Sequence, residues 1–221
     1  MAWPRLPRGC GDAVRFRPLT PDRLAAELAG WINSCTLGHP RIGFDGAAEI
    51  GATELADAVG SKIRMLGRPV IRASTGWWWR PASLRLELGR TDVDMLLGGW
   101  VDTAAVRREL LQPLRSGGSG SYLRRLRDPR TDRSLRDERE LAGDRDVLLL
   151  DGPFLLAAAL PLDAVVHLQV SPATLARSLP AERLWWTEAF DRYLAGNRPA
   201  AAAAVVVAYD HPSAPAASGL G

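Results

Sequence analysis

The sequence contains almost no lysine. Of its 28 basic residues only Lys62 is a lysine, so the other 27 are arginines, and with 25 acidic residues the formal net charge is +3. This surplus is too small to indicate a nucleic-acid-binding surface unless the arginines cluster. The 221 residues are 47% hydrophobic and 24% charged. This composition suits one globular domain and excludes a disordered protein, a small disulfide scaffold and a coiled coil.

Cysteines and long apolar runs are also scarce. Cys10 and Cys35 are the only cysteines, and without C-x-x-C spacing they favour a reducing compartment and argue against a metal site. No apolar run is long enough to cross a bilayer, and residues 1–11 lack the apolar stretch of a secretory signal. We therefore predict a cytoplasmic protein with no membrane partner.

Strands and helices are predicted to alternate along the chain. Thr20-Pro21-Asp22 starts an amphipathic helix. Strand 41–45, a glycine-bearing turn, a helix from Thr53 to Gly67 and strand 70–73 have the order and length of one right-handed βαβ unit. Further strands are predicted at 147–151, 164–170 and 203–209, helices at 102–114, 171–178 and 181–194, and a hairpin at 122–135.

This alternation predicts an α/β fold in which helices cover both faces of a mostly parallel sheet, a three-layer sandwich. Residues 1–19 are interpreted as an N-terminal arm, residues 20–211 as a single domain, and residues 212–221 as a disordered tail of Ser, Ala, Pro and Gly.

The turn between strand 41–45 and the next helix has most features of a phosphate-binding loop. Such a loop needs inward-facing backbone N–H groups, two glycines, a lysine for the terminal phosphates and a Ser or Thr for magnesium. Ala52 stands where the lysine belongs, and Lys62 lies about 15 Å further along the helix. The candidate nucleotide-binding residues in the loop are Gly46, Ala47, Ala48, Glu49, Ile50, Gly51, Ala52 and Thr53.

The negative charge of Glu49 also argues against phosphate binding by this loop. A carboxylate inside the ring of N–H groups would either repel a phosphate or occupy the anion site itself. We therefore interpret the loop as an anion cradle that has lost its cation and gained a negative charge.

Several segments together resemble the uridine kinase-like P-loop nucleoside kinases. The resemblance rests on the order and spacing of RIGFDG at 41–46, GRPVIRA at 67–73, LLQPL at 110–114 with Gly117-Gly118 after it, and LLDGPFL at 149–155, and extends to Arg192-Tyr193 and 205–212. It implies a P-loop kinase fold, ATP or GTP as donor, magnesium, and a nucleoside or related hydroxyl compound as acceptor. Thr53 and Asp151 match the magnesium-binding positions, and Arg177 matches an arginine of the lid.

The sequence departs from the family pattern at positions that would take part in catalysis and in binding the acceptor. Thr75-Gly76-Trp77-Trp78-Trp79 stands where the family has an acidic pair, an aromatic residue and a histidine, so the acid beside the acceptor hydroxyl is missing. Leu96, Leu97 and Gly99 replace the tyrosine and acid of the acceptor loop, and Ser178-Leu179-Pro180 indicates a reduced lid. A lost charged partner of a phosphate costs about 1.5–3 kcal/mol, and a lost general base about 10²–10⁴-fold in rate.

Two further groups of residues have competing interpretations. Trp77, Trp78 and Trp79 follow a strand at the edge of the sheet where ligands bind in open α/β folds; they are either a ligand- or partner-binding surface, with one or two rings exposed, or packing over a lost acceptor pocket. Residues 107–145 are rich in arginine, but the interleaved acids favour a solvated hairpin with surface ion pairs over a polyanion site.

Three functions follow from these observations. The first is a degenerate kinase that has lost phosphoryl transfer and acts by binding a small molecule, a protein partner or a second copy of itself. It would bind ATP or GTP with magnesium weakly or not at all. The second is an active kinase in which an arginine such as Arg72, Arg80 or Arg177 replaces the lysine. The third, an arginine-mediated nucleic-acid binder, is the least favoured.

Overall fold

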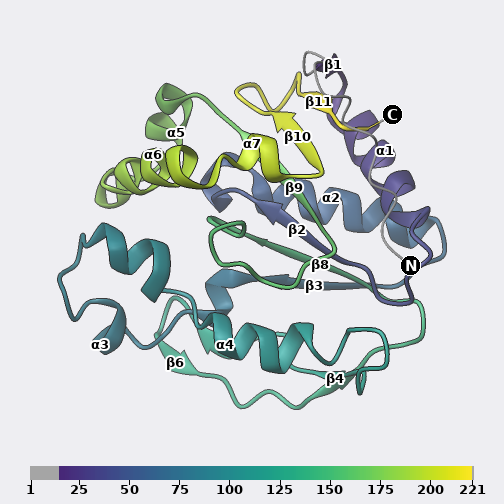
Figure 1. Ribbon diagram of the computed structural model, residues 1–221, viewed down its shortest axis with the longest axis horizontal. Helices are drawn as coiled ribbons and strands as arrows, with labels where there is room; N and C mark the ends of the chain where they lie inside the picture. The colour runs from purple at the N-terminus through teal and green to yellow at the C-terminus, as the bar shows by residue number, and fades with distance from the viewer. Residues whose placement is uncertain (1–14, 221) are drawn as a thin grey trace.

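A seven-stranded sheet forms the centre of the molecule (Figure 1). The structure, a computed structural model, describes residues 15–220, so Cys10 and most of the predicted N-terminal arm lie outside the described residues. The strand order is β1-β11-β10-β9-β2-β8-β3; the last five run parallel, and β11 is antiparallel to both β10 and β1. The bounds are β1 Arg17–Pro18, β2 Arg41–Asp45, β3 Val70–Ser74, β8 Val147–Gly152, β9 Ala164–Gln169, β10 Val205–Ala208 and β11 Ala216–Ser218.

Helices cover both faces of this sheet. Helices α1 and α2 pack together behind it, and α4 with its continuation η4 lies on the opposite side (Figure 1). The bounds are α1 Pro21–Asn33, η1 Ala48–Ile50, α2 Ala52–Met65, η2 Thr75–Trp78, α3 Ala82–Arg85, η3 Met95–Gly99, α4 Thr103–Ala105, η4 Val106–Leu111, α5 Pro172–Ser178, η5 Ala181–Arg183, α6 Trp186–Asn197 and α7 Pro199–Ala202. Among the described helices, none combines the length and apolar character needed to cross a membrane.

The core has two parts separated by the sheet. Along β8, Val147 and Leu149 belong to one cluster, while Leu148 and Leu150 belong to the other. All six residues of β8 are buried, as expected for a central parallel strand covered by helices on both faces. The predicted three-layer α/β sandwich is therefore confirmed.

Local sequence signals set most element boundaries correctly. The side chain of Thr20 accepts a hydrogen bond from Arg23 N–H at the start of α1, which is the predicted N-cap. The predicted hairpin is present as β5 (Arg127–Asp128) paired with β6 (Arg133–Ser134), inside a second ladder of β4 (Ser121–Tyr122) and β7 (Glu140–Leu141).

The predicted disorder of residues 212–221 is wrong at residues 216–218. Residues Ala216–Ser218 form β11, which pairs with β10 and with β1. The segment lacks an apolar pattern of its own, but backbone hydrogen bonds to a neighbouring strand do not depend on side-chain type. This part of the tail therefore extends the sheet between β10 and β1.

A buried polar network links β2, β9 and α6 directly behind the phosphate loop. Asp45 is 1% exposed; its Oδ1 accepts from the N–H of Leu155 at 2.9 Å, and its Oδ2 lies 2.7 Å from His167 Nδ1 and 2.6 Å from the hydroxyl of Tyr193, which donates to it. Burial and the Asp45 charge raise the pKa of Tyr193, so the hydroxyl stays protonated and remains a donor. The network fastens α6 to the strand that precedes the loop.

We expect Tyr193→Phe to lower the free energy of unfolding by about 1.5–3 kcal/mol, because it removes a hydrogen bond to a buried carboxylate. Urea unfolding followed by circular dichroism measures this change. Tyr209→Phe is the matched control, since Tyr209 is also buried and its hydroxyl has no hydrogen-bond partner among residues 15–220. An equal loss in both variants would contradict the assigned role of the network.

Candidate functional site

The phosphate loop is closed on itself by a turn of 3₁₀ helix. The N–H of Ile50 donates to the carbonyl of Ala47 at 3.2 Å, Gly51 N–H donates to Ala48 at 2.8 Å, and Ala52 N–H donates to Ala47 at 3.4 Å. Gly51 has φ +94°, and a Cβ there would lie 2.9 Å from the ring of Tyr209. Gly51 therefore adopts a positive φ that other residues rarely adopt, as expected for a glycine in such a loop. However, three N–H groups that would donate to a phosphate already donate to carbonyls within the loop.

Glu49 does not occupy the anion site of the loop, which was one of the two alternatives for its carboxylate. Its carboxylate forms an ion pair with the guanidinium of Arg183, in the segment that follows α5. We call residues 179–186 the lid segment. The negative charge of the loop is thus balanced by the lid segment, while the N–H groups of Ile50, Gly51 and Ala52 bond to loop carbonyls.

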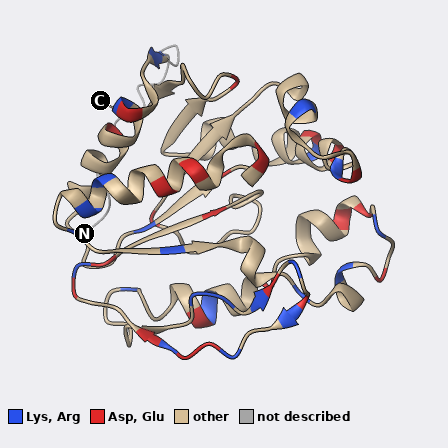
Figure 2. Ribbon diagram, turned by 180° about the vertical axis from the view of Figure 1, so that it is seen from behind, with Lys and Arg blue, Asp and Glu red and all other residues tan. Residues whose placement is uncertain are grey.

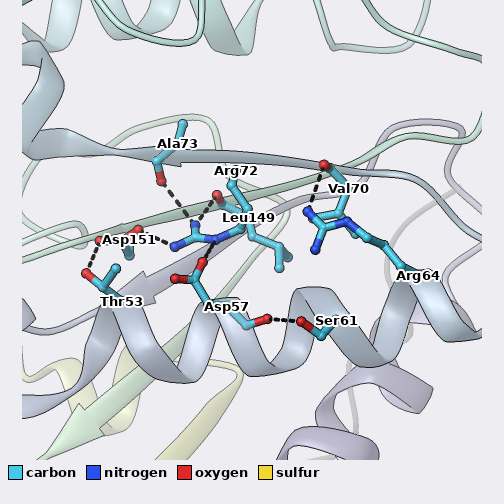
Figure 3. A network of polar contacts seen from close by, with 9 residues as sticks. All are labelled: Thr53, Asp57, Ser61, Arg64, Val70, Arg72, Ala73, Leu149 and Asp151. Carbon is cyan, nitrogen blue, oxygen red and sulfur yellow. Dashed lines mark hydrogen bonds and ion pairs between the residues drawn. The ribbon is translucent and has the colours of Figure 1, made fainter.

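The two predicted magnesium ligands touch each other, and an arginine completes the group (Figure 3). Thr53 donates its hydroxyl proton to Asp151 Oδ2 at 2.8 Å, and Arg72 Nη2 donates to Asp151 Oδ1 at 2.8 Å. Asp151 is 1% exposed. Both oxygens of this buried carboxylate therefore have partners, and its charge is balanced by a guanidinium.

Arg72 is held from several directions at once. Its Nε donates to Asp57 Oδ1 at 2.7 Å, and its Nη1 donates to the carbonyls of Leu149 at 2.8 Å and Ala73 at 3.3 Å. Figure 3 shows the guanidinium between β3 and α2, pointing at Asp151. A planar five-donor group suits such a set of fixed acceptors.

The residues present do not fit a magnesium ion with a triphosphate. The carboxylate that would hold the ion already has one hydroxyl partner and one cationic partner, and a guanidinium beside it repels a divalent cation. The loop has Ala52 in place of the lysine and pairs its N–H groups internally. No chemical step through magnesium follows from this geometry.

An open cleft of about 500 Å³ lies beside this ion-pair network. Such a volume is typical of sites for small molecules. Its walls combine hydroxyls, arginines paired with carboxylates and one tryptophan; Arg124 pairs with Glu140, and Arg125 pairs with Asp137 at 2.6 Å. The lining residues are Thr53, Asp57, Arg72, Ala73, Ser74, Trp77, Arg124, Arg125, Asp137, Glu140 and Asp151.

The three consecutive tryptophans point to three different places, because η2 is a helical turn and not the extended chain assumed from the sequence. Trp77 lines the cleft beneath the guanidinium of Arg125, 5.2 Å from its ring centroid. Trp78 is fully buried in the core. Trp79 packs edge-on against Trp100 at 5.1 Å. Trp77 and Trp79 are partly buried and Trp78 is buried, so the expectation of one or two exposed rings is wrong.

Trp79 and Trp100 belong to an aromatic cluster that receives the lid segment. Trp185 and Trp186 lie 5.9 Å and 5.6 Å from Trp100. The cavity beside them, also lined by Leu96, Leu97 and Phe154, measures about 30 Å³. This space holds little more than two water molecules, so the tryptophans fill most of the volume on this side of the sheet edge.

The structure brings some of the predicted site residues together and leaves others apart. Thr53 and Asp151, the two expected magnesium ligands, contact each other, whereas Arg177 is exposed and donates to Thr174 one turn away in α5. Arg183 was not predicted as a site residue, although it follows the Leu179-Pro180 break. Arg72 was considered only as a phosphate ligand, and the alternation of β3 could have placed its side chain toward α2.

The arginine-rich segment carries ion pairs and not a uniform basic surface. Blue and red segments alternate along residues 121–141 in Figure 2. Arg124–Glu140, Arg125–Asp137 and Arg139–Glu109 are paired, as the interleaved acids predicted. This arrangement lowers the potential that a nucleic-acid backbone would require.

Comparison with known proteins identifies the class of fold. No family model and no curated protein matches the sequence. Among solved structures, a possible uridine kinase from Bacillus stearothermophilus superposes with a TM-score of 0.67 at 22% identity, covering 83% of this chain and 96% of its own. A proposed fructose transport system kinase from Silicibacter sp. TM1040 gives 0.57 at 18% identity, covering 84% and 95%. The protein YGR205w gives 0.61 at 10% identity, covering 90% and 99%. The chain therefore has the fold of the P-loop kinases.

We expect Arg72→Met to lower the free energy of unfolding by about 3 kcal/mol, because it leaves the buried Asp151 carboxylate without its cation. For a chain of this size the melting temperature would fall by about 6 °C or more. Arg192→Met is the matched control: Arg192 also bridges two carboxylates, Asp94 and Glu188, but all three are exposed. Its loss should cost less than about 1 kcal/mol. Equal effects of the two substitutions would show that Arg72 is not a structural cation.

Proposed function

We propose that this protein is a kinase-fold protein that has lost phosphoryl transfer and acts by binding. The observation that carries the proposal is the Arg72 guanidinium on Asp151, 2.8 Å from the carboxylate. A kinase needs that carboxylate to help hold a magnesium ion that neutralises phosphate charge. Here a side chain of the protein itself already neutralises the carboxylate, and the closed loop and Ala52 support the same conclusion.

The cleft beside Trp77 is the binding site in this proposal, and a small polar molecule is its ligand. Its volume suits such a molecule, and its walls offer hydroxyls, an aromatic ring and charged groups whose charges are balanced in pairs. Balanced pairs can donate and accept hydrogen bonds without selecting a strong net charge on the ligand. The alternative, an ATP-dependent kinase with an atypical loop, is supported by the kinase fold and by the Thr53–Asp151 contact.

Thermal unfolding with and without ATP and magnesium separates these two functions. A ligand at a hundred times its Kd stabilises the folded state by about 2.7 kcal/mol, which raises Tm by several degrees. We expect no magnesium-dependent shift with ATP or GTP, and no phosphoryl transfer to nucleosides. Magnesium alone and nucleotide with a chelator are the controls. A magnesium-dependent rise in Tm with nucleotide turnover would establish the kinase instead.

A thermal-shift screen of nucleosides, sugars and other small polar compounds tests the cleft. Compounds that raise Tm should lose about tenfold or more in affinity in Trp77→Ala, because the variant removes an aromatic wall of the site. Met65→Ala is the control: Met65 ends α2 and is 79% exposed, and it is not among the residues lining the cleft. Compounds that bind equally well to both variants would place the ligand elsewhere.

A further inference from the structure

The lid segment is joined to the phosphate loop by one charged contact. Arg183 of η5 reaches Glu49 of η1, two residues 134 positions apart in the sequence. The side chains of Arg183 and Glu49 are 36% and 19% exposed. The pair is therefore partly shielded from solvent, where an ion pair is worth more than on an open surface.

Arg183 also contacts two rings of the aromatic cluster. Its guanidinium carbon lies 5.0 Å from the ring centroid of Trp186 and 6.0 Å from that of Trp79. Both distances are within the range of cation–π attraction. One arginine therefore connects the phosphate loop, the end of η2 and the lid segment.

We propose that the Glu49 carboxylate acts as an internal substitute for a ligand phosphate and holds the lid segment closed over the loop. Carboxylate and phosphate oxygens bind a guanidinium through the same forked donors. In this arrangement the Glu49 carboxylate pairs with Arg183 in the place that a phosphate group of a bound ligand would take. The closed arrangement is then a built-in state of the free protein and does not wait for a ligand.

The surrounding contacts make the lid segment a small opening unit. Within it, Arg183 N–H donates to Pro180 at 2.8 Å and Leu184 N–H donates to Ala181 at 3.3 Å, so these two amide protons are protected while the segment stays closed. Leu179 and Trp186, at the two ends of the segment, are buried, but Ala181, Glu182 and Leu184 between them are exposed and contribute little apolar burial. Few buried contacts and short-range hydrogen bonds are typical of segments that open locally while the core stays folded.

Hydrogen–deuterium exchange of the full chain without nucleotide tests the proposal. In Glu49→Ala, and equally in Glu49→Gln, which preserves side-chain shape, we expect the amides of Arg183 and Leu184 to exchange about three- to tenfold faster. This factor corresponds to the loss of one partly shielded ion pair. The amides of β8 should keep their wild-type rates, because the central sheet does not depend on this contact.

Two further variants make the outcome specific to the pair. Glu188→Ala removes an arginine pair of α6, that of Arg192 with Glu188, and should leave residues 181–186 unchanged. The charge-exchanged variant Glu49→Arg with Arg183→Glu should recover at least half of the lost protection on a logarithmic scale. Unchanged exchange in both Glu49 variants, or an increase shared by β8 or by Glu188→Ala, would overturn the proposal. Because no nucleotide is present, magnesium-dependent nucleotide turnover by the wild type would refute the proposed function and leave this result intact.

Discussion

The ion pair between Arg72 and Asp151 is the interaction on which the site depends. A carboxylate that is 1% exposed needs a compensating positive charge, since burying it alone would cost several kcal/mol. In a magnesium-dependent enzyme the metal ion and its ligands can supply that compensation. In this chain a guanidinium on the neighbouring strand β3 supplies it.

The same principle explains the loop. A loop built to receive phosphate leaves N–H groups free to donate to the ligand, and such groups must find other partners when no phosphate binds. Here Ile50, Gly51 and Ala52 donate to carbonyls of the loop itself, which tightens it into a 3₁₀ turn. Glu49 then lies on the outside of that turn and meets Arg183. The Arg72 guanidinium supplies a positive charge beside Asp151, and the Glu49 carboxylate supplies a negative charge to Arg183, so both charges come from the protein's own side chains.

The fold could be predicted from the sequence because its signals are local. Apolar runs such as Val147–Leu150 and the Thr20 cap of α1 depend on neighbouring residues alone, and the glycine-bearing turn after strand 41–45 identified the βαβ unit. The P-loop kinase fold was implied by the resemblance of several segments to the uridine kinase-like family. By contrast, the strand at Ala216–Ser218 has no side-chain pattern to reveal it, because it forms by pairing with β10 and β1.

The site was predicted only in part, because its decisive contacts join residues far apart in the chain. The absence of the lysine could be predicted, because the spacing of Gly46 and Gly51 places Ala52 at the lysine position. The pairing of Arg72 with Asp151 or of Glu49 with Arg183 was not, since 27 arginines and 25 acids allow many combinations that only the fold resolves. The tryptophans could not be placed from the sequence for the same reason. Three consecutive rings were interpreted as one surface, but in the helical turn Trp77 lies in the cleft, Trp78 in the core and Trp79 against the aromatic cluster beside the lid segment.

The distribution of aromatic side chains suggests why a closed lid and an open cleft coexist. The cluster of Trp79, Trp100, Trp185 and Trp186 leaves a cavity of only about 30 Å³, whereas the cleft beside Trp77 retains about 500 Å³. Large rings bury much apolar area with few rotatable bonds, so they stabilise the lid segment without a nucleotide beneath it. The charges of Arg183 and Glu49 fix the position of that segment. The lid segment packs on one side of η2, and the cleft proposed as the ligand site lies on the other side, beside Trp77.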